Sequence, residues 1–519
     1  MRMLFSFPLS PPLPWRPLSR LLAVTAVGLA LASSPAGAAD KADTAHDGEP
    51  LGLALSRTLG FSPAGATERD PLSVNKLAAG PMGSFNEGIC SFPDATAPAA
   101  PLTLAQVVDR ALCNNPQTRA AWSSARAQAA QVGVARGAYL PSLTGNLSAS
   151  RNRNENSSGF TTNSNQASAG LSASYVLFDF GARDAALQAA LESLTASNYT
   201  LDATLQRVFL TAVQSYFNLF AARAAIDAST TSERSADEAL KAATARNNAG
   251  TATPADRLQA QTAYSQAVLN RIQAEGNARS AEGVLANTMG LDASKPVPLV
   301  LPDTQVPDQR FDSDLDAMIS AAKKQRPDLA AAEAQVRSAQ ANVDLARASG
   351  RPTVSLTANI NASDTSLPTS NLTNGQAFGI TLSIPLFQGF APTYRTEAAR
   401  AQADNQLAQR DTLALQVALD VWQAHAALVT NTQAVRTSAD LVASATESER
   451  LASGRYRAGV GSILDVLTAQ SALASARQQN IQAVYNFHIA KAALARSMGQ
   501  LDAAALDRYR IAPSTGIAP

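Results

Sequence analysis

A helical hairpin occurs twice in this chain of 519 residues, and the spacing of the two copies constrains the fold more than any other feature. In each copy an Ala-rich run ends at glycine, Gly250 in the first and Gly459 with Gly461 in the second. Glycine commonly follows the C-terminus of a helix. A second helix then begins at a hydroxyl residue followed by an acid, Asp256 or Asp465. Matching residues stand 209 positions apart, which indicates that the hairpin was duplicated.

The duplication extends over most of the chain. Asn115-Pro116 is matched by Arg326-Pro327, and Val176-Leu177-Phe178-Asp179 by Pro385-Leu386-Phe387-Gln388. A period near 210 residues is far longer than the unit of a solenoid, so two similar halves should stand side by side. The domain plan is a first repeat at 102–292, a proline-rich linker at 293–312, a second repeat at 313–502 and a C-terminal tail at 503–519.

The N-terminus has the pattern of an exported protein. Arg16 and Arg20 precede an apolar run at 21–32, and Ala36-Gly37-Ala38 follows it. This predicts a secretory signal peptide at 1–38, cut after Ala38. A membrane anchor is the alternative, but the run is shorter than the roughly 20 residues that span a bilayer. Residues rich in Ala, Pro, Gly and Ser, without periodicity, predict an irregular N-terminal extension at 39–100.

Charge and motif content bound the function. The net charge of +1 gives no case for a nucleic-acid partner. Phosphate-binding loops, nucleophile elbows and metal-binding helix motifs are absent, and His46, His425 and His488 are isolated. We therefore expect no enzymatic activity, no cofactor and no metal. Cys90 and Cys113 should form a disulfide in an oxidising compartment; two free thiols are the alternative.

Four stretches alternate between apolar and small polar residues. They predict four strands of about ten residues in two hairpins, at 142–178 and 353–387, joined by Asn-, Ser- and Thr-rich loops at 151–166 and 364–375. A half-buried sheet in a soluble domain explains each strand equally well. Export, and polar faces that carry hydroxyls and amides rather than charges, favour transmembrane strands of an outer-membrane barrel.

Each strand hairpin is followed by a pair of long helices, at 182–290 and 390–499. The run 182–248 would extend about 100 Å at about 1.5 Å per residue. Its apolar residues follow a coiled-coil spacing, with Asn198 and Ser215 filling gaps in the seam. Small side chains elsewhere leave each helix two contact faces, as a helix with a neighbour on each side requires. The return helices are expected at 254–290 and 462–499.

Closure of the barrel requires more than one chain. Single-chain barrels begin at about eight strands, and open strand edges are not tolerated in lipid. Two copies would give eight strands, largely filled by side chains, and three would give twelve, wide enough for a lumen. Because the helices are much longer than a bilayer is thick, they should project into the periplasm.

Taken together, these features resemble the TolC-type outer-membrane factors over about 102–502. The resemblance implies mixed α and β structure: a homotrimer with a twelve-stranded barrel, four strands per chain, continuous with a periplasmic coiled-coil helical barrel. It also implies a periplasmic adaptor and an inner-membrane transporter, ABC or proton-driven, as partners. The lead segment and residues 111–118 resemble the CyaE branch, which serves type I protein secretion. The alternatives are a multidrug efflux component and, in another class, a periplasmic coiled-coil adaptor or structural protein.

The resemblance also implies a gate at the hairpin ends. The family carries two acidic rings in the pattern Asp-x-x-Asp, which falls here on Asp465 and Thr468, so only the first acid is present. Asp256 and Tyr456 match positions of a polar link between the hairpins, whereas Gly461 stands where the family has an arginine. The alternative for both acids is a simple stabilising charge at a helix N-terminus, worth about 0.3–1 kcal/mol.

Overall fold

The structure is a computed structural model that describes residues 70–80, 101–155, 161–295, 297–302, 314–366 and 371–501. The chain divides into two units, 1–69 and 70–519, and all described residues belong to the second. The predicted signal peptide at 1–38, Cys90, most of the extension at 39–100, parts of the linker at 293–312 and the tail at 503–519 lie outside the described residues.

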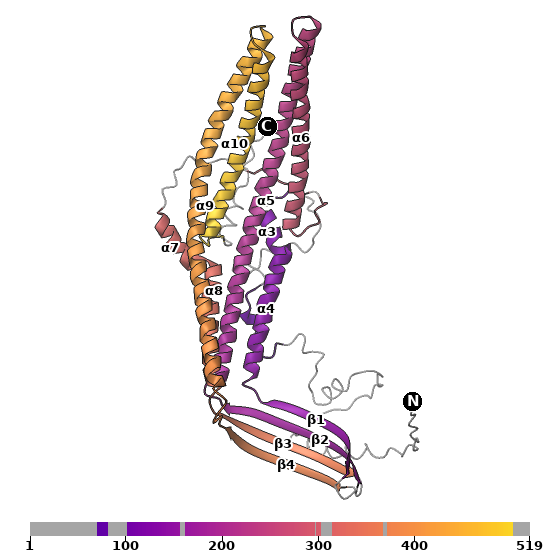
Figure 1. Cartoon of the computed structure of the whole chain (residues 1–519), viewed down its shortest axis with the longest axis vertical. Coiled ribbons are helices and arrows are strands. Elements are labelled where there is room, and N and C mark those ends of the chain that lie inside the picture. The colour runs from indigo at the N-terminus through magenta and orange to yellow at the C-terminus, as the bar shows by residue number, and fades with distance from the viewer. Residues whose placement is uncertain are drawn as a thin grey trace, which may run out of the picture. The chain divides into compact units, whose positions relative to one another are not determined.

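The second unit contains the same series of elements twice (Figure 1). In both repeats the four helices have the same lengths, 11, 22, 67 and 35 residues. The first repeat consists of α3 (Leu104–Asn114), α4 (Pro116–Gly137), β1 (Ser142–Glu155), β2 (Thr161–Phe178), α5 (Ala182–Asn248) and α6 (Pro254–Thr288). The second consists of α7 (Leu315–Gln325), α8 (Pro327–Ala348), β3 (Thr353–Ser366), β4 (Asn371–Ser383), α9 (Ala391–Arg457) and α10 (Ile463–Ser497). The internal duplication is confirmed.

Proline separates the two short helices of each repeat. Asn115 and Arg326 have extended backbone, and Pro116 and Pro327 begin the helices that follow. Proline disfavours helical geometry in the residue before it and is well tolerated at the first helical position. Asn115 also accepts a hydrogen bond from the Gln117 amide at 2.8 Å. The chain therefore breaks its helix at Asn115 and at Arg326, in the same place in both repeats.

The four strands form one antiparallel sheet in the order β1-β2-β3-β4. The long loops predicted at 151–166 and 364–375 were wrong, because pairing continues through them: Arg151 pairs with Asn165, and Asp364 with Leu372. The strands have 13 to 18 residues, not about ten, and β4 ends at Ser383. Ladder hydrogen bonds use the backbone, so polar side chains do not end a strand.

The long helices lie side by side in a fixed order. Beyond the short helices α5 packs against α6 and α10, and α10 packs against α9; nearer the sheet the order is α4, α5, α8 and α9 (Figure 1). The main core gathers residues of α3, α5, α10 and the C-terminal end of α6, including Leu201, Leu205, Val208 and Leu219 of the predicted seam. Tyr216 adds a hydrogen bond to the Val300 carbonyl, and burial raises its pKa.

Part of the predicted irregular extension is ordered against the helices. Residues 70–80 pack along α4 and α5, with Val74 among Ala129, Val132 and Leu194. Asn198, which the sequence placed in a gap of the seam, accepts a hydrogen bond from the Ala79 amide at 3.0 Å and donates one to the Leu77 carbonyl at 3.2 Å. This amide therefore holds the extension on the surface of α5.

Candidate functional site

The ends of the two helical hairpins have the same backbone design. Gly250 and Gly459 have φ values of 73° and 81°, in the left-handed region that favours glycine. The next residue closes the turn, since the Thr251 amide donates to the Arg246 carbonyl and the Val460 amide to the Arg455 carbonyl. Each helix therefore ends in a Schellman motif, which satisfies its last carbonyl groups.

Capping boxes begin the return helices α6 and α10. The Thr253 amide donates to the Asp256 carboxylate at 2.9 Å, and the Ser462 amide donates to the Asp465 carboxylate at 3.2 Å. Each hydroxyl accepts from the amide of its acid in return. Both candidate gate acids thus have a cap role. Asp465 and Thr468 are also exposed, one turn apart on α10, so that Asp465 is open to solvent on its other side.

Tyr456 joins the two hairpins through its ring. It is buried with alanines of α5 and α6 and with Ile463 and Val466 of α10. The guanidinium carbon of Arg246, at the end of α5, lies 4.6 Å from the ring centroid. The Tyr456 hydroxyl is buried without a hydrogen-bond partner among the described residues. The link that the structure shows is therefore a cation–π contact with apolar packing, and Asp256 bonds to its own cap.

Gly461 is also explained by close packing. A Cβ atom on Gly461 would lie 3.1 Å from both the Arg455 Cβ and the Tyr456 amide nitrogen. The turn after α9 folds back onto the last turn of that helix, which leaves little room for a side chain. A tight backbone turn therefore stands where the resemblance implies an arginine, and the cation near Tyr456 is Arg246.

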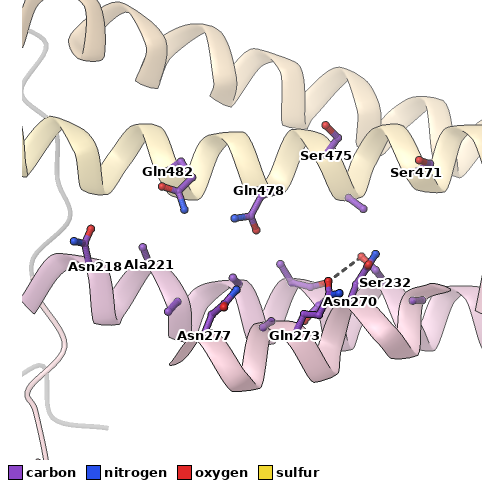
Figure 2. Close-up of a pocket in the computed structure, with 17 residues that line it drawn as sticks. Asn218, Ala221, Ser232, Asn270, Gln273, Asn277, Ser471, Ser475, Gln478 and Gln482 are labelled. Carbon is purple, nitrogen blue, oxygen red and sulfur yellow. Dashed lines mark hydrogen bonds between the residues drawn. The ribbon is translucent and has the colours of Figure 1, made fainter. Parts of the chain in front are cut away.

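A long groove lies between the two hairpins. It has a volume of about 540 Å³ and is bordered by α5 and α6 on one side and α10 on the other (Figure 2). Its lining contains only alanine and uncharged polar residues, among them Asn218, Asn270, Gln273, Gln478 and Gln482. Amide and hydroxyl side chains bind neither metal nor phosphate tightly without charged neighbours, so the groove has no chemistry of a catalytic or cofactor site.

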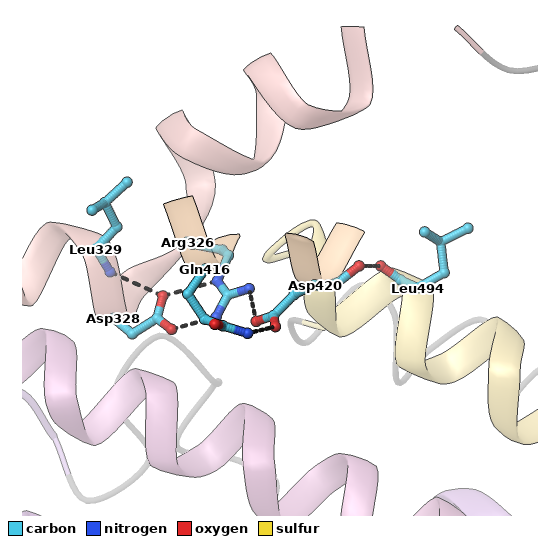
Figure 3. Close-up of polar contacts among 7 residues, drawn as sticks. Arg326, Asp328, Leu329, Gln416, Asp420 and Leu494 are labelled. Atoms are coloured by element: carbon cyan, nitrogen blue, oxygen red, sulfur yellow. Dashed lines mark hydrogen bonds and ion pairs between the residues drawn. The ribbon is translucent and has the colours of Figure 1, made fainter. Parts of the chain in front are cut away.

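In the second repeat a charged cluster forms around Arg326, at the position that Asn115 occupies in the first repeat. Arg326 is 7% exposed and bonds to Asp328 at 2.5 Å and to Asp420 of α9 at 2.7 Å (Figure 3). Gln416 donates to the other Asp420 oxygen at 2.7 Å. Burial favours the neutral form of Asp328, but the hydrogen bonds and charge of Arg326 outweigh it and hold its pKa below the usual value. This cluster joins α8 to α9 and is structural.

The remaining site predictions have different outcomes. Cys113, at the end of α3, takes part in a disulfide; its expected partner Cys90 lies outside the described residues, so the pairing stays a prediction. None of the helices in the described parts of the chain has the length and apolar character that crossing a bilayer requires. Sequence reasoning missed Arg246, because a contact with Tyr456, 210 residues away, leaves no local signal.

Comparison with known proteins identifies the family. The family described as outer membrane efflux protein matches residues 107–291 and 318–500, one stretch in each repeat. The chain is 32% identical to Protein CyaE of Bordetella pertussis over 410 residues, which cover 78% of this chain and 86% of that protein. It is 30% identical to the pyoverdine export outer membrane protein OpmQ of Pseudomonas aeruginosa over 404 residues, which cover 73% and 81%.

Solved structures agree on the fold. The Campylobacter jejuni CmeC outer membrane channel matches with a TM-score of 0.69 at 20% identity, over 84% of this chain and 95% of that chain. The open state of the Neisseria gonorrhoeae MtrE outer membrane channel matches with a TM-score of 0.65 at 24% identity, over 77% and 90%. The chain belongs to the outer membrane efflux protein family, whose members are trimeric outer-membrane channels that extend into the periplasm of Gram-negative bacteria.

Proposed function

We propose that three copies of this chain form the outer-membrane channel of a type I protein secretion system. The observation that carries this proposal is the 32% identity with CyaE over 78% of the chain, together with the resemblance of residues 111–118 to that branch. The relatives named for pyoverdine export and for efflux are 26–30% identical.

The channel is a passive conduit in this proposal. Four strands per chain supply the membrane part, and helix pairs of 67 and 35 residues supply a tunnel through the periplasm. Energy comes from an inner-membrane transporter, ABC or proton-driven, through a periplasmic adaptor that meets the hairpin ends.

The same proposal assigns the gate to Asp465. Three copies around one axis would concentrate negative charge in a constriction with low-dielectric walls, which focuses the electric field. Thr468 adds no charge to this ring, so the attraction for cations is weaker than that of a double acidic ring. In this proposal Tyr456 holds the hairpin ends together through its ring, and Asp256, which caps the first turn of α6, fixes the hairpin end beside it.

Small-molecule efflux is the second candidate. It is favoured by the similarity to OpmQ and to the probable efflux pump outer membrane protein TtgC of Pseudomonas putida, which is 28% identical over 390 residues. The candidate of another class is a periplasmic adaptor. This function does not explain the exposed apolar face of the four-stranded sheet.

The two leading candidates differ in what the cell loses with the gene. Deletion in the native host, complemented by wild-type protein, should remove specific proteins from the culture supernatant and leave drug susceptibility unchanged. Supernatant proteins are compared by mass spectrometry, and susceptibility by growth inhibition. An unchanged set of secreted proteins with increased drug susceptibility would reject protein secretion in favour of efflux.

A further inference from the structure

One face of the sheet carries an apolar belt of limited height. In β1 the odd-numbered residues Leu143 and Leu147 lie on this face, and both are exposed. The pairing register continues the rows across the sheet: Leu171 pairs with Ile360, and Ala358 with Phe378. Side chains alternate between the faces of a strand, and the lipid-facing side of a barrel is the apolar one. This face is therefore the one that contacts lipid.

Aromatic residues mark the periplasmic edge of the belt. Phe178 pairs with Val354 at the last row between β2 and β3, close to where α5 begins. It contacts Phe180 with ring centroids 4.7 Å apart, and in the second repeat Phe387 contacts Phe390 at 5.5 Å. Aromatic girdles commonly stand at the membrane interfaces of barrels. Each repeat thus carries one such pair between its second strand and its long helix.

Two arginines stand at the opposite edge. Arg151 and Arg153 continue the odd-numbered face of β1 beyond Leu147 and Ala149, and both are exposed. No hydrogen bond or ion pair joins either side chain to another described residue. Because β1 runs away from α4, the two arginines lie at the end of the sheet that is nearer the cell exterior. Cations on this face cost roughly 2–4 kcal/mol at the midplane but about 0–1 at an interface.

The register gives the depth of these arginines. Phe178 lies 13 residues further along β2 than Asn165, the pairing partner of Arg151. At about 3.3 Å per residue and a tilt of about 45°, this stretch spans about 30 Å along the membrane normal. The aromatic-flanked apolar band of such barrels is about 25 Å tall. Arg151 therefore lies just outside the band, at the level of the headgroups, and Arg153 one row further out.

We infer that Arg151 and Arg153 bind the phosphate groups of a phosphorylated lipid in the outer leaflet. A guanidinium group presents a planar fork of donors that matches phosphate in a bidentate way. Two such groups on one face of one strand can hold two phosphates or clamp one. The partner is a lipid rather than a soluble anion because the apolar residues of β1 and β2 directly below the arginines, Leu147, Ala149, Ala167 and Ala169, accommodate acyl chains.

The nearest acids on this face lie in other rows of the sheet than the two arginines. Glu155 lies two residues beyond Arg153 on the same face, further from the belt. Asp364 pairs with Ala167, one row nearer the periplasm and two strands away from β1. On the lipid-facing side of the sheet, the row of each arginine therefore contains no carboxylate.

Binding of lipid A tests the inference. The intact trimer is extracted in detergent, titrated with lipid A that carries both phosphates, and observed by native mass spectrometry. The variant Arg151→Gln with Arg153→Gln should bind about ten-fold more weakly, because charge-assisted hydrogen bonds are lost. The matched control is Arg234→Gln with Arg279→Gln, two exposed arginines of α5 and α6, which should bind like wild type.

Two further probes identify the chemistry. Dephosphorylated lipid A should bind wild type as weakly as lipid A binds the glutamine variant. Millimolar inorganic phosphate should not displace lipid A. Equal binding of lipid A by wild type and the glutamine variant, or by the phosphorylated and dephosphorylated lipids, would overturn the inference, and complete displacement by phosphate would indicate a soluble-anion site instead.

If the glutamine variant does not assemble, a variant with two lysines tests the inference by the same binding measurement. Arg151→Lys with Arg153→Lys keeps both charges but removes the planar fork. It should bind lipid A more weakly than wild type does. Its binding should still be tighter than that of wild type to dephosphorylated lipid A. Binding by the lysine variant equal to that of wild type would contradict bidentate recognition.

Discussion

Asp465 accepts a hydrogen bond from the Ser462 amide and stands exposed one turn before Thr468. Its charge and its cap role can be separated, because asparagine also caps helices well. Asp465→Asn should reduce cation selectivity and block by multivalent cations while the protein remains folded. The measurement is the reversal potential of single channels in planar bilayers under a salt gradient.

The control is the same change, Asp to Asn, in the first turn of a helix that lies away from the hairpin ends. Asp316 is an exposed acid in the first turn of α7, away from the hairpin ends. Asp316→Asn should leave selectivity and block unchanged. If Asp465→Asn behaves the same way, Asp465 is only a cap residue, and the gate must be sought elsewhere.

Tyr456 and Arg246 give a second prediction at the residue scale. A cation–π contact is worth about 0.5–1 kcal/mol at exposed sites, so Arg246→Gln should raise the ratio of open to closed channels about two- to five-fold. Tyr456→Phe keeps the ring and removes only a hydroxyl without a partner, so it should not raise this ratio. An open probability raised by Tyr456→Phe would reveal a hydroxyl bond that the single chain does not contain.

The residues that sequence alone identified at the site are those with local signals. Gly250, Gly459 and the capping acids follow from the chemistry of helix ends, which depends on a few neighbouring residues. The role of Arg246 depends on a ring in the other repeat, and that of Asn198 depends on the backbone at Leu77 and Ala79. Contacts of this kind appear only once the chain is folded.

At the scale of elements, the two hairpin turns can be compared directly. Gly250 and Gly459 have similar positive φ values, so alanine should cost each turn about 1 kcal/mol or more. A Cβ atom on Gly459 would also lie 3.3 Å from an Arg246 nitrogen, whereas Gly250 faces open space. Gly459→Ala should therefore lower the thermal midpoint, followed by circular dichroism, more than Gly250→Ala. Equal midpoints would show that the Arg246 side chain moves away from the added Cβ atom at little cost.

The Arg326 cluster predicts a dependence of stability on pH. The pKa of Asp328 is lower in the folded chain than its ordinary value of 3.8, so the pair contributes stability above that pH and loses it as the pH falls through the folded pKa. Arg326→Gln should cost about 1–3 kcal/mol at pH 7, because two half-buried carboxylates lose their partner. The difference in thermal midpoint between the two proteins should shrink below about pH 4.

A surface pair serves as the comparison for this prediction. Arg337 bonds to Glu192 at 2.8 Å but is 47% exposed, and exposed pairs contribute about 0–1 kcal/mol. Arg337→Gln should therefore lower the midpoint less than Arg326→Gln. A constant difference between wild type and Arg326→Gln from pH 7 to pH 3 would show that Arg326 acts through packing rather than charge.

Helices and strands differed in how well their ends could be predicted. The ends of α5 and α10 agree with the sequence within about two residues, because caps and glycines are local. The strand ends on the helix side also agree for β1, β2 and β3, but the ends on the loop side did not, since the segments around Asn165 and Asp364 look like loops by composition yet pair with their neighbours. The length of a strand depends on how far the neighbouring strand continues to pair with it, and the alternation of residues within one strand does not indicate this.

The whole molecule is incomplete as a single chain. The outer strands β1 and β4 each have one unpaired edge, and such edges are not tolerated in lipid. Exposed apolar residues occupy the outer helices as well, including Leu258 and Ile272 of α6 and Leu415 and Trp422 of α9. Because the two edges of the chain are different surfaces, contact between copies is head-to-tail and closes into a ring.

The most direct test of this account is the mass of the assembly extracted from the outer membrane, measured by native mass spectrometry. Four strands per chain and two unlike edges predict a trimer as the only major species, with twelve strands in one barrel. A stable monomer or dimer as the main species would contradict it, because neither closes a barrel with a lumen.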